Sequence, residues 1–592
     1  MKKREEIEEK HKWDLTKFCK NNDDFYVRLE NLKPKVDEFK IYEGKLKDSD
    51  EILFECLEKL ISFNKESGLL YVYASLYKKG DNANEEANIM CEKISEFLNK
   101  NVSKMVFIDV EISKFSRQKL KALMENDKFK NYHRMFERTL RLKKHTLSKK
   151  EEILISKIGN FADGFSENFD KFSDIDLDFG EIEDKDGKKY KLTQSNYSLY
   201  VESKDRIIRE NAFRRMNGKF GEFINTLANN YISDIKTTNF YATVRKYKSS
   251  LSRSIYKEEA SETTYKLLIK KIHENLDILT DFFEIKRKML NLDKIAIYDT
   301  FAPICEELDY KFTYDEAIEI IKKAVTVLGQ DYVELIDRAK NERWIDVMPN
   351  KNKDSGAFSW GCYGVTPVVL TNFEGNLESV FTLAHELGHA MHTYYSNSHQ
   401  PPQNAGYTIF VAEVASTTNE MLLLDYLLKN AKTDKERIYF YNHFMVQVRS
   451  TIFRQTMFAE FEELAYSTYE SGTPLTQQFL CSKYFDLNKT YYKNVELIDE
   501  IKYEWSRIPH FYSPFYVYKY ATGLICAINI SNKLLTENEK MLPKYKKFLS
   551  SGSVKSPISL LKDCDCDLEQ ETIYDDVFEV CKGFLSKWKE II

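Results

Sequence analysis

The chain is poor in the two residues that most often interrupt helices, with 11 prolines and 20 glycines in 592 residues. This scarcity favours a mostly helical fold, because Pro removes a helix hydrogen bond and Gly costs about 1 kcal/mol in a helix interior. No uninterrupted apolar run reaches the roughly 20 residues that cross a bilayer. The first ten residues are charged and lack the apolar stretch of a secretory signal. We therefore expect a cytoplasmic protein with no membrane partner.

An excess of charge of one sign is also missing, since 88 basic and 93 acidic residues give a formal net charge of −5. This balance gives no support for nucleic-acid binding, which uses basic surfaces. The ten cysteines are scattered, and without an export signal we expect them to be reduced. The length exceeds one ordinary core, so we expect two or more subdomains.

A turn signal suggests where the chain divides. Residues 1–185 read as helices with polar connections and carry no convincing chemical constellation. The dipeptide Asp186-Gly187 marks a turn between two short segments. We place the boundary there, with an N-terminal helical region at 1–185 and a second region at 186–592, which carries the motifs described next.

The chemistry centres on the motif H-E-L-G-H at residues 385–389. Apolar residues recur around it at three- and four-residue spacing, which predicts a helix, and Asn376 is placed to cap its start. Positions four apart share a helix face, so His385 and His389 can hold one metal ion between them. Glu386 can then take a proton from a water on that ion, which is the zinc-peptidase arrangement.

A catalytic zinc needs a third protein ligand and an open position. His392 is one candidate, because it lies close to the face that carries the motif. Glu413 is the better candidate, because its stretch is otherwise apolar or small and a carboxylate there is costly to bury unless it is paired or binds metal. The alternative for Glu413 is an acid in the first turn of a helix, favoured by the helix dipole. Gly388, in mid-helix, indicates close packing or function.

The pattern H-E-L-G-H-x-x-H, followed by V-A-E-V-A-S-T-x-N-E, resembles the oligoendopeptidase F family of thimet-oligopeptidase-like zinc metallopeptidases. Segments at 13–15, 355–360 and 510–523 also resemble that family, in the same order. The resemblance implies a mostly α fold in which two helical halves enclose a deep substrate channel. It also favours a role in peptide binding for a small β-sheet beside the zinc-binding helix.

The function implied by the resemblance is that of a zinc-dependent endopeptidase acting on internal bonds of oligopeptides. One Zn²⁺ ion would be bound by His385, His389 and Glu413, with Glu386 as general base and acid. Two alternatives stay open: a zinc exopeptidase, which needs a free peptide terminus, and a catalytically silent zinc-dependent peptide-binding protein. The intact Glu386 argues against the silent form, since binding alone needs no proton acceptor. The oligomeric state is not predicted.

Short strands are predicted before the zinc helix, at 357–360 and 365–371. The edge of a small sheet can pair with an extended peptide, which gives affinity without demanding a sequence. The candidate substrate-binding residues are Gly356, Ala357, Phe358 and Ser359. An ordinary hairpin that supports the helix is the alternative.

Two further residues are predicted to support the metal ligands. Glu420 lies two helical turns after Glu413, on the same face, and we predict that it orients a zinc-binding imidazole by hydrogen bonding. A solvent-facing acid is the alternative for Glu420. His392 is assigned a supporting or packing role rather than a ligand role.

The last candidates are His510, Tyr516 and Tyr520, which would stabilise the negative oxygen that forms when water attacks a peptide carbonyl. We expect His510 in a loop at 508–514, and Tyr516 and Tyr520 on one helix face because they are four apart. The resemblance implies that a His and Tyr residues after the zinc motif contact the substrate carbonyl. An aromatic stripe packed in the core is the alternative for the tyrosines.

Overall fold

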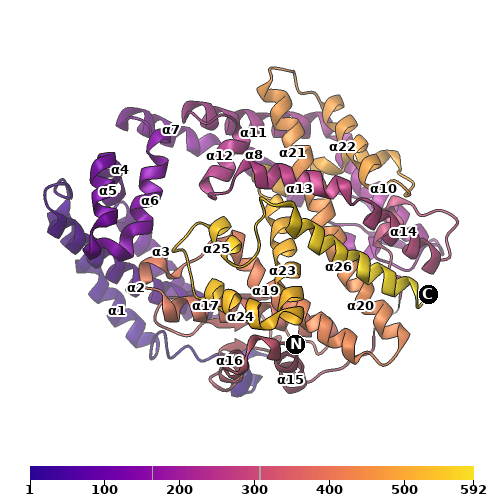
Figure 1. Cartoon of the computed structure of the whole chain (residues 1–592), viewed down its shortest axis with the longest axis horizontal. Coiled ribbons are helices and arrows are strands. Elements are labelled where there is room, and N and C mark those ends of the chain that lie inside the picture. The colour runs from indigo at the N-terminus through magenta and orange to yellow at the C-terminus, as the bar shows by residue number, and fades with distance from the viewer. Residues whose placement is uncertain (163, 306–307) are drawn as a thin grey trace. The chain divides into compact units, whose positions relative to one another are not determined.

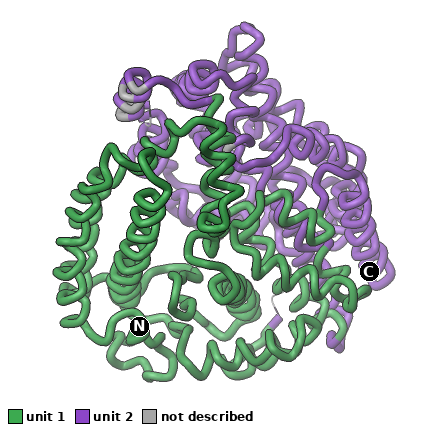
Figure 2. Tube along the Cα trace, turned by 60° about the vertical axis from the view of Figure 1, so that its left-hand side comes forward, with its two compact units in different colours: residues 1–144, 309–429, 530–566 green, residues 145–308, 430–529, 567–592 purple. Residues whose placement is uncertain are grey.

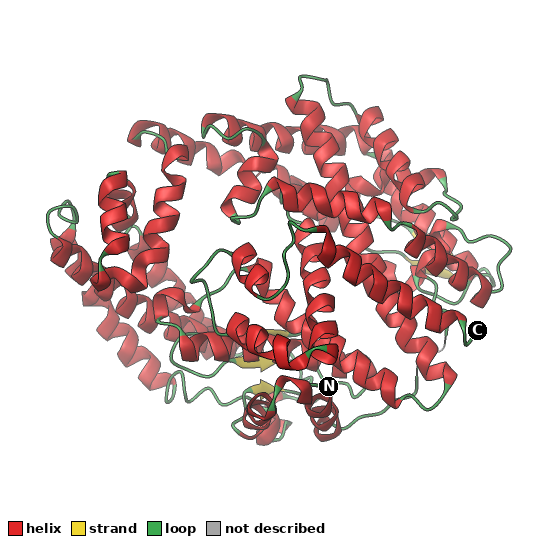
Figure 3. Cartoon of the chain, in the orientation of Figure 1, coloured by secondary structure: helices red, strands yellow, loops and turns green. Residues whose placement is uncertain are grey.

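The computed structural model describes residues 1–162, 164–305 and 308–592. Helices dominate these ranges, and the strands there form two small sheets (Figures 1 and 3). The predicted mostly α class is therefore confirmed. Within the same ranges, every helix is too short or too polar to cross a bilayer.

The chain forms two compact units, each built from three separate segments (Figure 2). Unit 1 comprises residues 1–144, 309–429 and 530–566, and unit 2 comprises residues 145–308, 430–529 and 567–592. The units are defined by contacts within each of them, and their segments alternate along the sequence. The predicted boundary after residue 185 separates two regions of sequence and stays a prediction.

Unit 1 carries the H-E-L-G-H motif. Its helices are α1 (Asn22–Asp37), α2 (Asp50–Gly80), α3 (Glu85–Val102), α4 (Phe107–Ser113), α5 (Arg117–Glu125), α6 (His133–Leu142), α15 (Tyr314–Ala324), α16 (Gln330–Asn341), α17 (Leu377–His399), α18 (Pro402–Ala405), α19 (Ile409–Asn430), α24 (Asn538–Leu549) and α25 (Pro557–Asp563). One buried core joins the start of the chain, including Trp13 and Leu70, to Val368 and Leu370 of a strand.

That strand belongs to a three-stranded sheet that packs beside α17. β3 (Ile345–Asp346) pairs in parallel with β5 (Val368–Leu370), and β5 pairs antiparallel with β4 (Phe358–Trp360). β5 is buried and wholly apolar, as a central strand should be. β4 is an edge strand, with no further strand beside it in the described ranges. The small sheet predicted next to the helix is confirmed.

Unit 2 is helical apart from one hairpin. Its helices are α7 (Lys149–Ala162), α8 (Gly164–Lys171), α9 (Tyr197–Val201), α10 (Arg206–Glu222), α11 (Ile224–Val244), α12 (Ser250–Lys257), α13 (Glu262–Glu274), α14 (Asp277–Met289), α20 (Asp434–Gln447), α21 (Arg454–Glu470), α22 (Gln477–Tyr491) and α26 (Glu571–Lys589). α23 (Tyr518–Thr536) begins in unit 2 and ends in unit 1. The hairpin joins β1 (Glu181–Glu183) to β2 (Lys189–Lys191), which confirms the turn predicted around Gly187.

Candidate metal centre

Helix α17 carries the two histidines of the motif on one face. It begins after Asn376, whose side-chain oxygen accepts the N–H of Ser379 at 2.9 Å, so the predicted cap is confirmed. The helix is unbroken through the motif, which places His385 and His389 one turn apart with ring centroids separated by 4.8 Å.

Gly388 allows α19 to pass close to this helix. A Cβ atom on Gly388 would lie 2.6 Å from Ser416 Cα and 2.9 Å from Ala415 O, which is too close for any side chain. Nearby, Asn419 Nδ2 donates a hydrogen bond to Ala384 O at 3.1 Å. The close packing expected from a mid-helix glycine is therefore present. Asn419 was given no role from the sequence, although it lies within the matched motif.

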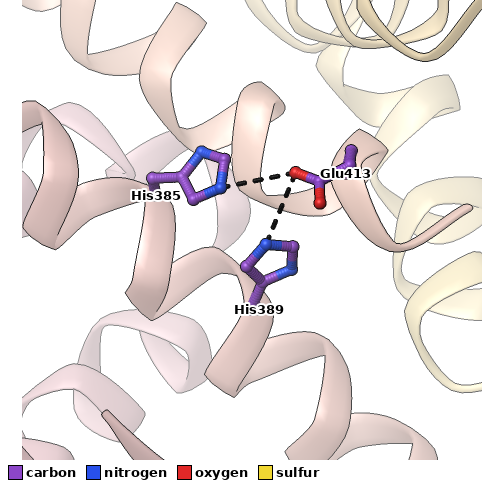
Figure 4. A group of neighbouring side chains, drawn as sticks. All are labelled: His385, His389 and Glu413. Atoms are coloured by element: carbon purple, nitrogen blue, oxygen red, sulfur yellow. Dashed lines mark ion pairs between the residues drawn. The ribbon is translucent and has the colours of Figure 1, made fainter. Parts of the chain in front are cut away.

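Glu413, near the start of α19, points toward both histidines (Figure 4). Its Oε2 lies 3.4 Å from His385 Nε2 and 3.5 Å from His389 Nε2. Two ligand atoms held about 2.0–2.2 Å from a tetrahedral ion are roughly 3.3–3.6 Å apart. One donor atom from each residue lies within 4.8 Å of the other two. The nitrogen and oxygen donors and their spacing therefore fit a zinc ion.

The charges around these residues favour a cation. Burial raises the pKa of the Glu413 carboxyl, but hydrogen bonds with His385 and His389 outweigh burial and hold that pKa well below its usual range. Burial lowers the pKa of His385, but Glu413 and Glu420 outweigh it and raise that pKa to about 10. The carboxylates thus stabilise positive charge at the imidazoles, which a divalent ion would supply.

Glu420 contacts the other side of one imidazole. His385 Nδ1 donates a hydrogen bond to Glu420 Oε1 at 2.6 Å. Such a bond fixes a proton on Nδ1, so that Nε2, which faces Glu413, is the nitrogen available to a metal. The sequence predicted that Glu420 bonds to an imidazole, and in the structure that imidazole belongs to His385.

Glu386 and His392 occupy different surroundings on the same helix. Glu386 is 7% exposed, and burial is the main cause that raises its pKa. A carboxyl with a raised pKa is better matched to proton transfer near neutral pH. His392 is buried and stacks flat on Tyr407, with ring centroids 3.8 Å apart. It is not among the three donors that gather within 4.8 Å.

His510, Tyr516 and Tyr520 form a cluster within unit 2. His510 lies in the short 3-10 helix η11 (Pro509–Tyr512), so the loop predicted at this residue is wrong. The prediction that one helix carries both tyrosines is also wrong, because α23 begins only at Tyr518. The rings still meet: His510 Nε2 and Tyr520 OH share a hydrogen bond of 3.2 Å, and the Tyr516 and Tyr520 centroids are 5.4 Å apart.

A residue with an unusual backbone conformation explains the late start of α23. Phe515 has a φ of 55°, in the left-handed region that bulky residues rarely adopt. Glu462 of α21 accepts the N–H of Phe515 at 2.9 Å. Burial raises the pKa of Glu462 well above its usual value. Sequence reasoning missed Glu462, and only Pro514 signalled a break before the helix.

The predicted substrate-binding residues lie at the edge of the sheet. Gly356 and Ala357 precede β4, and Phe358 and Ser359 are its first two residues. Gly356 has a φ of 83°, which favours glycine. A pocket of about 340 Å³ is lined by Gly356, Ala357 and the first turns of α17, including Thr382. An edge strand beside a pocket is a suitable place for an extended peptide.

Comparison with known proteins identifies relatives along the whole chain. The model of Peptidase family M3 matches residues 199–580, and the Oligopeptidase F model matches residues 111–179. Oligopeptidase PepF of Bacillus subtilis is 36% identical over 590 residues, which cover 99% of this chain and 88% of PepF. An oligoendopeptidase F homolog of Lactococcus lactis is 34% identical over 601 residues, which cover 100% and 99%.

Two solved structures of similar fold point to the same family. A putative peptidase from Chlamydophila abortus is 31% identical, with a TM-score of 0.96 over 100% of both chains. Oligoendopeptidase-F from Enterococcus faecium is 28% identical, with a TM-score of 0.73 over 96% of this chain and 99% of its own. The family suggested by the motifs is therefore confirmed, and the chain belongs to peptidase family M3, within the oligoendopeptidase F group.

Proposed function

We propose that the protein is a zinc-dependent endopeptidase that hydrolyses internal bonds of oligopeptides. The proposal is carried by the group formed by His385, His389 and Glu413, with donor spacings of 3.4 and 3.5 Å beside the buried Glu386. Membership of family M3 supports peptidase chemistry. The names of the relatives, Oligopeptidase PepF and oligoendopeptidase F, support oligopeptides as substrates.

Each residue of the site in unit 1 would have a separate role in the reaction. His385, His389 and Glu413 would hold one Zn²⁺ ion, which when bound makes water more acidic and polarises a peptide carbonyl. Glu386 accepts a proton from the attacking water at a carboxylate oxygen and later delivers it to the leaving amine. Glu420 keeps the proton of His385 on Nδ1, so that Nε2 remains free for the metal.

Substrate contacts complete the proposal. Residues 356–359 would bind the peptide main chain along the edge of β4, which selects extended peptides without reading their sequence. His510, Tyr516 and Tyr520 would donate hydrogen bonds to the oxygen of the reacting carbonyl. His392 would support α17 through its stacking on Tyr407. The region 1–185 would form the N-terminal oligopeptidase F-type part.

Digestion of a mixed peptide pool, with products mapped by mass spectrometry, tests this function. The protein should cleave internal bonds, including those of peptides blocked at both ends. A chelator should stop cleavage, and stoichiometric zinc should restore it. Cleavage only beside free termini would favour the exopeptidase, and zinc binding without turnover would favour the peptide-binding protein. Cleavage that a chelator does not affect would contradict the zinc mechanism.

A further inference from the structure

Side chains hold both polar atoms of one peptide group in unit 2. Ser254 Oγ of α12 donates a hydrogen bond to Pro514 O at 2.8 Å, and a carboxyl oxygen of Glu462 in α21 accepts the N–H of Phe515 at 2.9 Å. Pro514 O and Phe515 N belong to the same planar peptide group and point in opposite directions. The two contacts, from helices far apart in the sequence, therefore fix the orientation of this group.

This peptide group lies at the centre of a β-turn. Tyr516 N donates a hydrogen bond to Ser513 O at 3.2 Å, with Pro514 second and Phe515 third in the turn. The φ of 55° at Phe515 matches a type II turn, whose third position usually takes Gly or Asn. A type I turn has its central peptide group turned over and a negative φ at the third position, which suits Phe. The sequence alone therefore favours type I, and the two side-chain contacts favour type II.

Glu462 is a costly residue if it serves packing alone. Its side chain is fully buried, and its Oε2 has no hydrogen-bond partner among the described residues. A buried carboxyl with an unpaired oxygen is unfavourable, whereas an apolar side chain of similar size would fill the same space. The left-handed Phe515 is unfavourable as well. Such features persist where the conformation of the chain serves a function, and here both meet at one peptide group.

The turn lies between the residues of the aromatic cluster. His510 precedes the turn, Tyr516 is its last residue, and Tyr520 follows in the first turn of α23. The ring centroids of His510 and Tyr516 are 6.4 Å apart, and those of His510 and Tyr520 are 5.7 Å apart. Groups that stabilise a reacting oxygen must be held to within about 0.5 Å of their productive positions. Turning the central peptide group over would therefore misplace their hydrogen bonds, because the chain on both sides of that group carries the cluster.

We propose that Glu462 and Ser254 are positioning residues for the reaction: they hold the 514–515 peptide group in its type II orientation, and this orientation places Tyr516 and Tyr520 beside His510. Neither Glu462 nor Ser254 is proposed to touch the substrate. The inference rests on the proposed function, in which this cluster donates hydrogen bonds to the oxygen of the reacting carbonyl. It adds the residues on which the placement of those donors depends.

Steady-state hydrolysis of a quenched peptide blocked at both ends, at equal zinc content, tests the proposal. Glu462→Met keeps the length of the side chain but removes the acceptor, and should lower kcat roughly tenfold or more with KM unchanged. Glu462→Gln keeps an oxygen that can accept the N–H of Phe515, and should retain kcat within about twofold. Ser254→Ala removes the contact at the other end of the peptide group and should also lower kcat. Glu463→Met, at the next position of α21, is the matched control and should behave like the parent.

A double-variant cycle shows whether Glu462 acts through the cluster. When Tyr520→Phe is added to Glu462→Met, kcat should fall by much less than the product of the two single effects, because a misplaced hydroxyl has little left to contribute. Single effects that multiply would overturn the inference, since Glu462 would then act independently of Tyr520.

Melting temperatures and the activity of the parent separate the remaining outcomes. Glu462→Met should melt close to the parent, because it removes a buried carboxyl with an unpaired oxygen. Parent-like kcat in Glu462→Met or in Ser254→Ala would overturn the inference and leave the proposed function standing, and equal losses in Glu462→Met and Glu462→Gln would also overturn it. A parent that holds zinc but cleaves no peptide would refute the proposed function and this inference with it.

Discussion

Two carboxylates of α19 act on opposite nitrogens of one imidazole. Glu420 accepts from Nδ1 of His385 at 2.6 Å, while Glu413 lies 3.4 Å from Nε2 of the same ring. Because a proton fixed on Nδ1 leaves Nε2 as the nitrogen that could bind a metal, the orientation of this proposed ligand depends on a residue outside the proposed ligand set. Helical spacing predicted that Glu420 shares a face with Glu413, but could not show which imidazole it meets.

The first prediction concerns that hydrogen bond. Glu420→Ala should lower zinc affinity about 10- to 100-fold, because the ligand imidazole loses its orientation and part of its basicity. Competition with a chelating dye measures the change. Asp425→Ala is the control on the same helix, since Asp425 forms an ion pair with Lys429 at 2.7 Å. Unchanged affinity in Glu420→Ala would remove the assigned role.

The second prediction concerns acid stability. Burial lowers the pKa of His392 from 6.5 to about 3, so the folded protein keeps this ring neutral. The unfolded chain takes up the proton first as the pH falls through 6.5, which favours unfolding. The cost attributable to His392 should be about 2 kcal/mol between pH 7 and pH 5.

His392→Phe, which can keep the stack on Tyr407, isolates this contribution. The free energy of unfolding of the parent should fall by about 2 kcal/mol more than that of His392→Phe over the same pH interval. Urea unfolding at the two pH values measures both. Parallel pH profiles would mean that His392 becomes protonated in the folded protein as readily as in the unfolded chain.

At the scale of elements, the crossing of α17 and α19 brings together the three residues of the candidate metal centre. Apolar spacing and the Asn376 cap predicted α17, and a second apolar run predicted α19, because both signals are local. The crossing depends on contacts between distant segments, for which Gly388 was the sole sequence signal. No local sequence pattern indicates the hydrogen bond from Asn419 to Ala384.

The third prediction tests this crossing. Gly388→Ala places a Cβ atom 2.6 Å from Ser416 Cα, so the helices must separate. We expect a loss of stability of about 1–3 kcal/mol together with weaker zinc binding, because Glu413 moves with α19. Gly583→Ala is the control: apart from its chain neighbours and the backbone of its own helix, no described atom lies within 4 Å of its new Cβ, so this change in α26 should be neutral or stabilising. Parent-like zinc affinity in Gly388→Ala would contradict the account of the crossing.

A turn before α23 decides how the aromatic cluster of unit 2 forms. Four-residue spacing predicted that Tyr516 and Tyr520 would be neighbours on a helix, and they are neighbours although only Tyr520 is helical. The left-handed Phe515, held by Glu462, starts the helix late and folds Tyr516 back toward it. Helical periodicity cannot reveal such a turn, because the contact comes from a residue more than 50 positions away.

The fourth prediction concerns the hydroxyl in this cluster. If Tyr520 donates to the reacting oxygen, Tyr520→Phe should lower kcat about 100-fold, since one such donor is worth about 3 kcal/mol. Zinc content and melting temperature should not change. Tyr518→Phe is the matched control, because its ring is buried and packs against Tyr265. Equal kcat in the parent, Tyr520→Phe and His510→Ala would show that the cluster is structural.

At the scale of the whole molecule, each compact unit is assembled from three separated segments. The low content of proline and glycine predicted the helical class, and short apolar runs predicted the sheet beside α17. The interleaving could not be predicted, because it depends on contacts between residues far apart in the sequence. Trp13 and Leu370, for example, share the core of unit 1, and no local sequence pattern indicates that contact. The substrate channel enclosed by two helical halves stays a prediction.

In the proposed mechanism, Glu386 moves the proton while His385, His389 and Glu413 hold zinc. The most direct test is the rate at which Glu386→Gln hydrolyses a quenched peptide blocked at both ends, at the same zinc content as the parent. Gln keeps the size of the side chain but cannot accept the proton, so the rate should fall about 100- to 10,000-fold with zinc still bound. Hydrolysis at the parent's rate by the zinc-loaded variant would contradict the account.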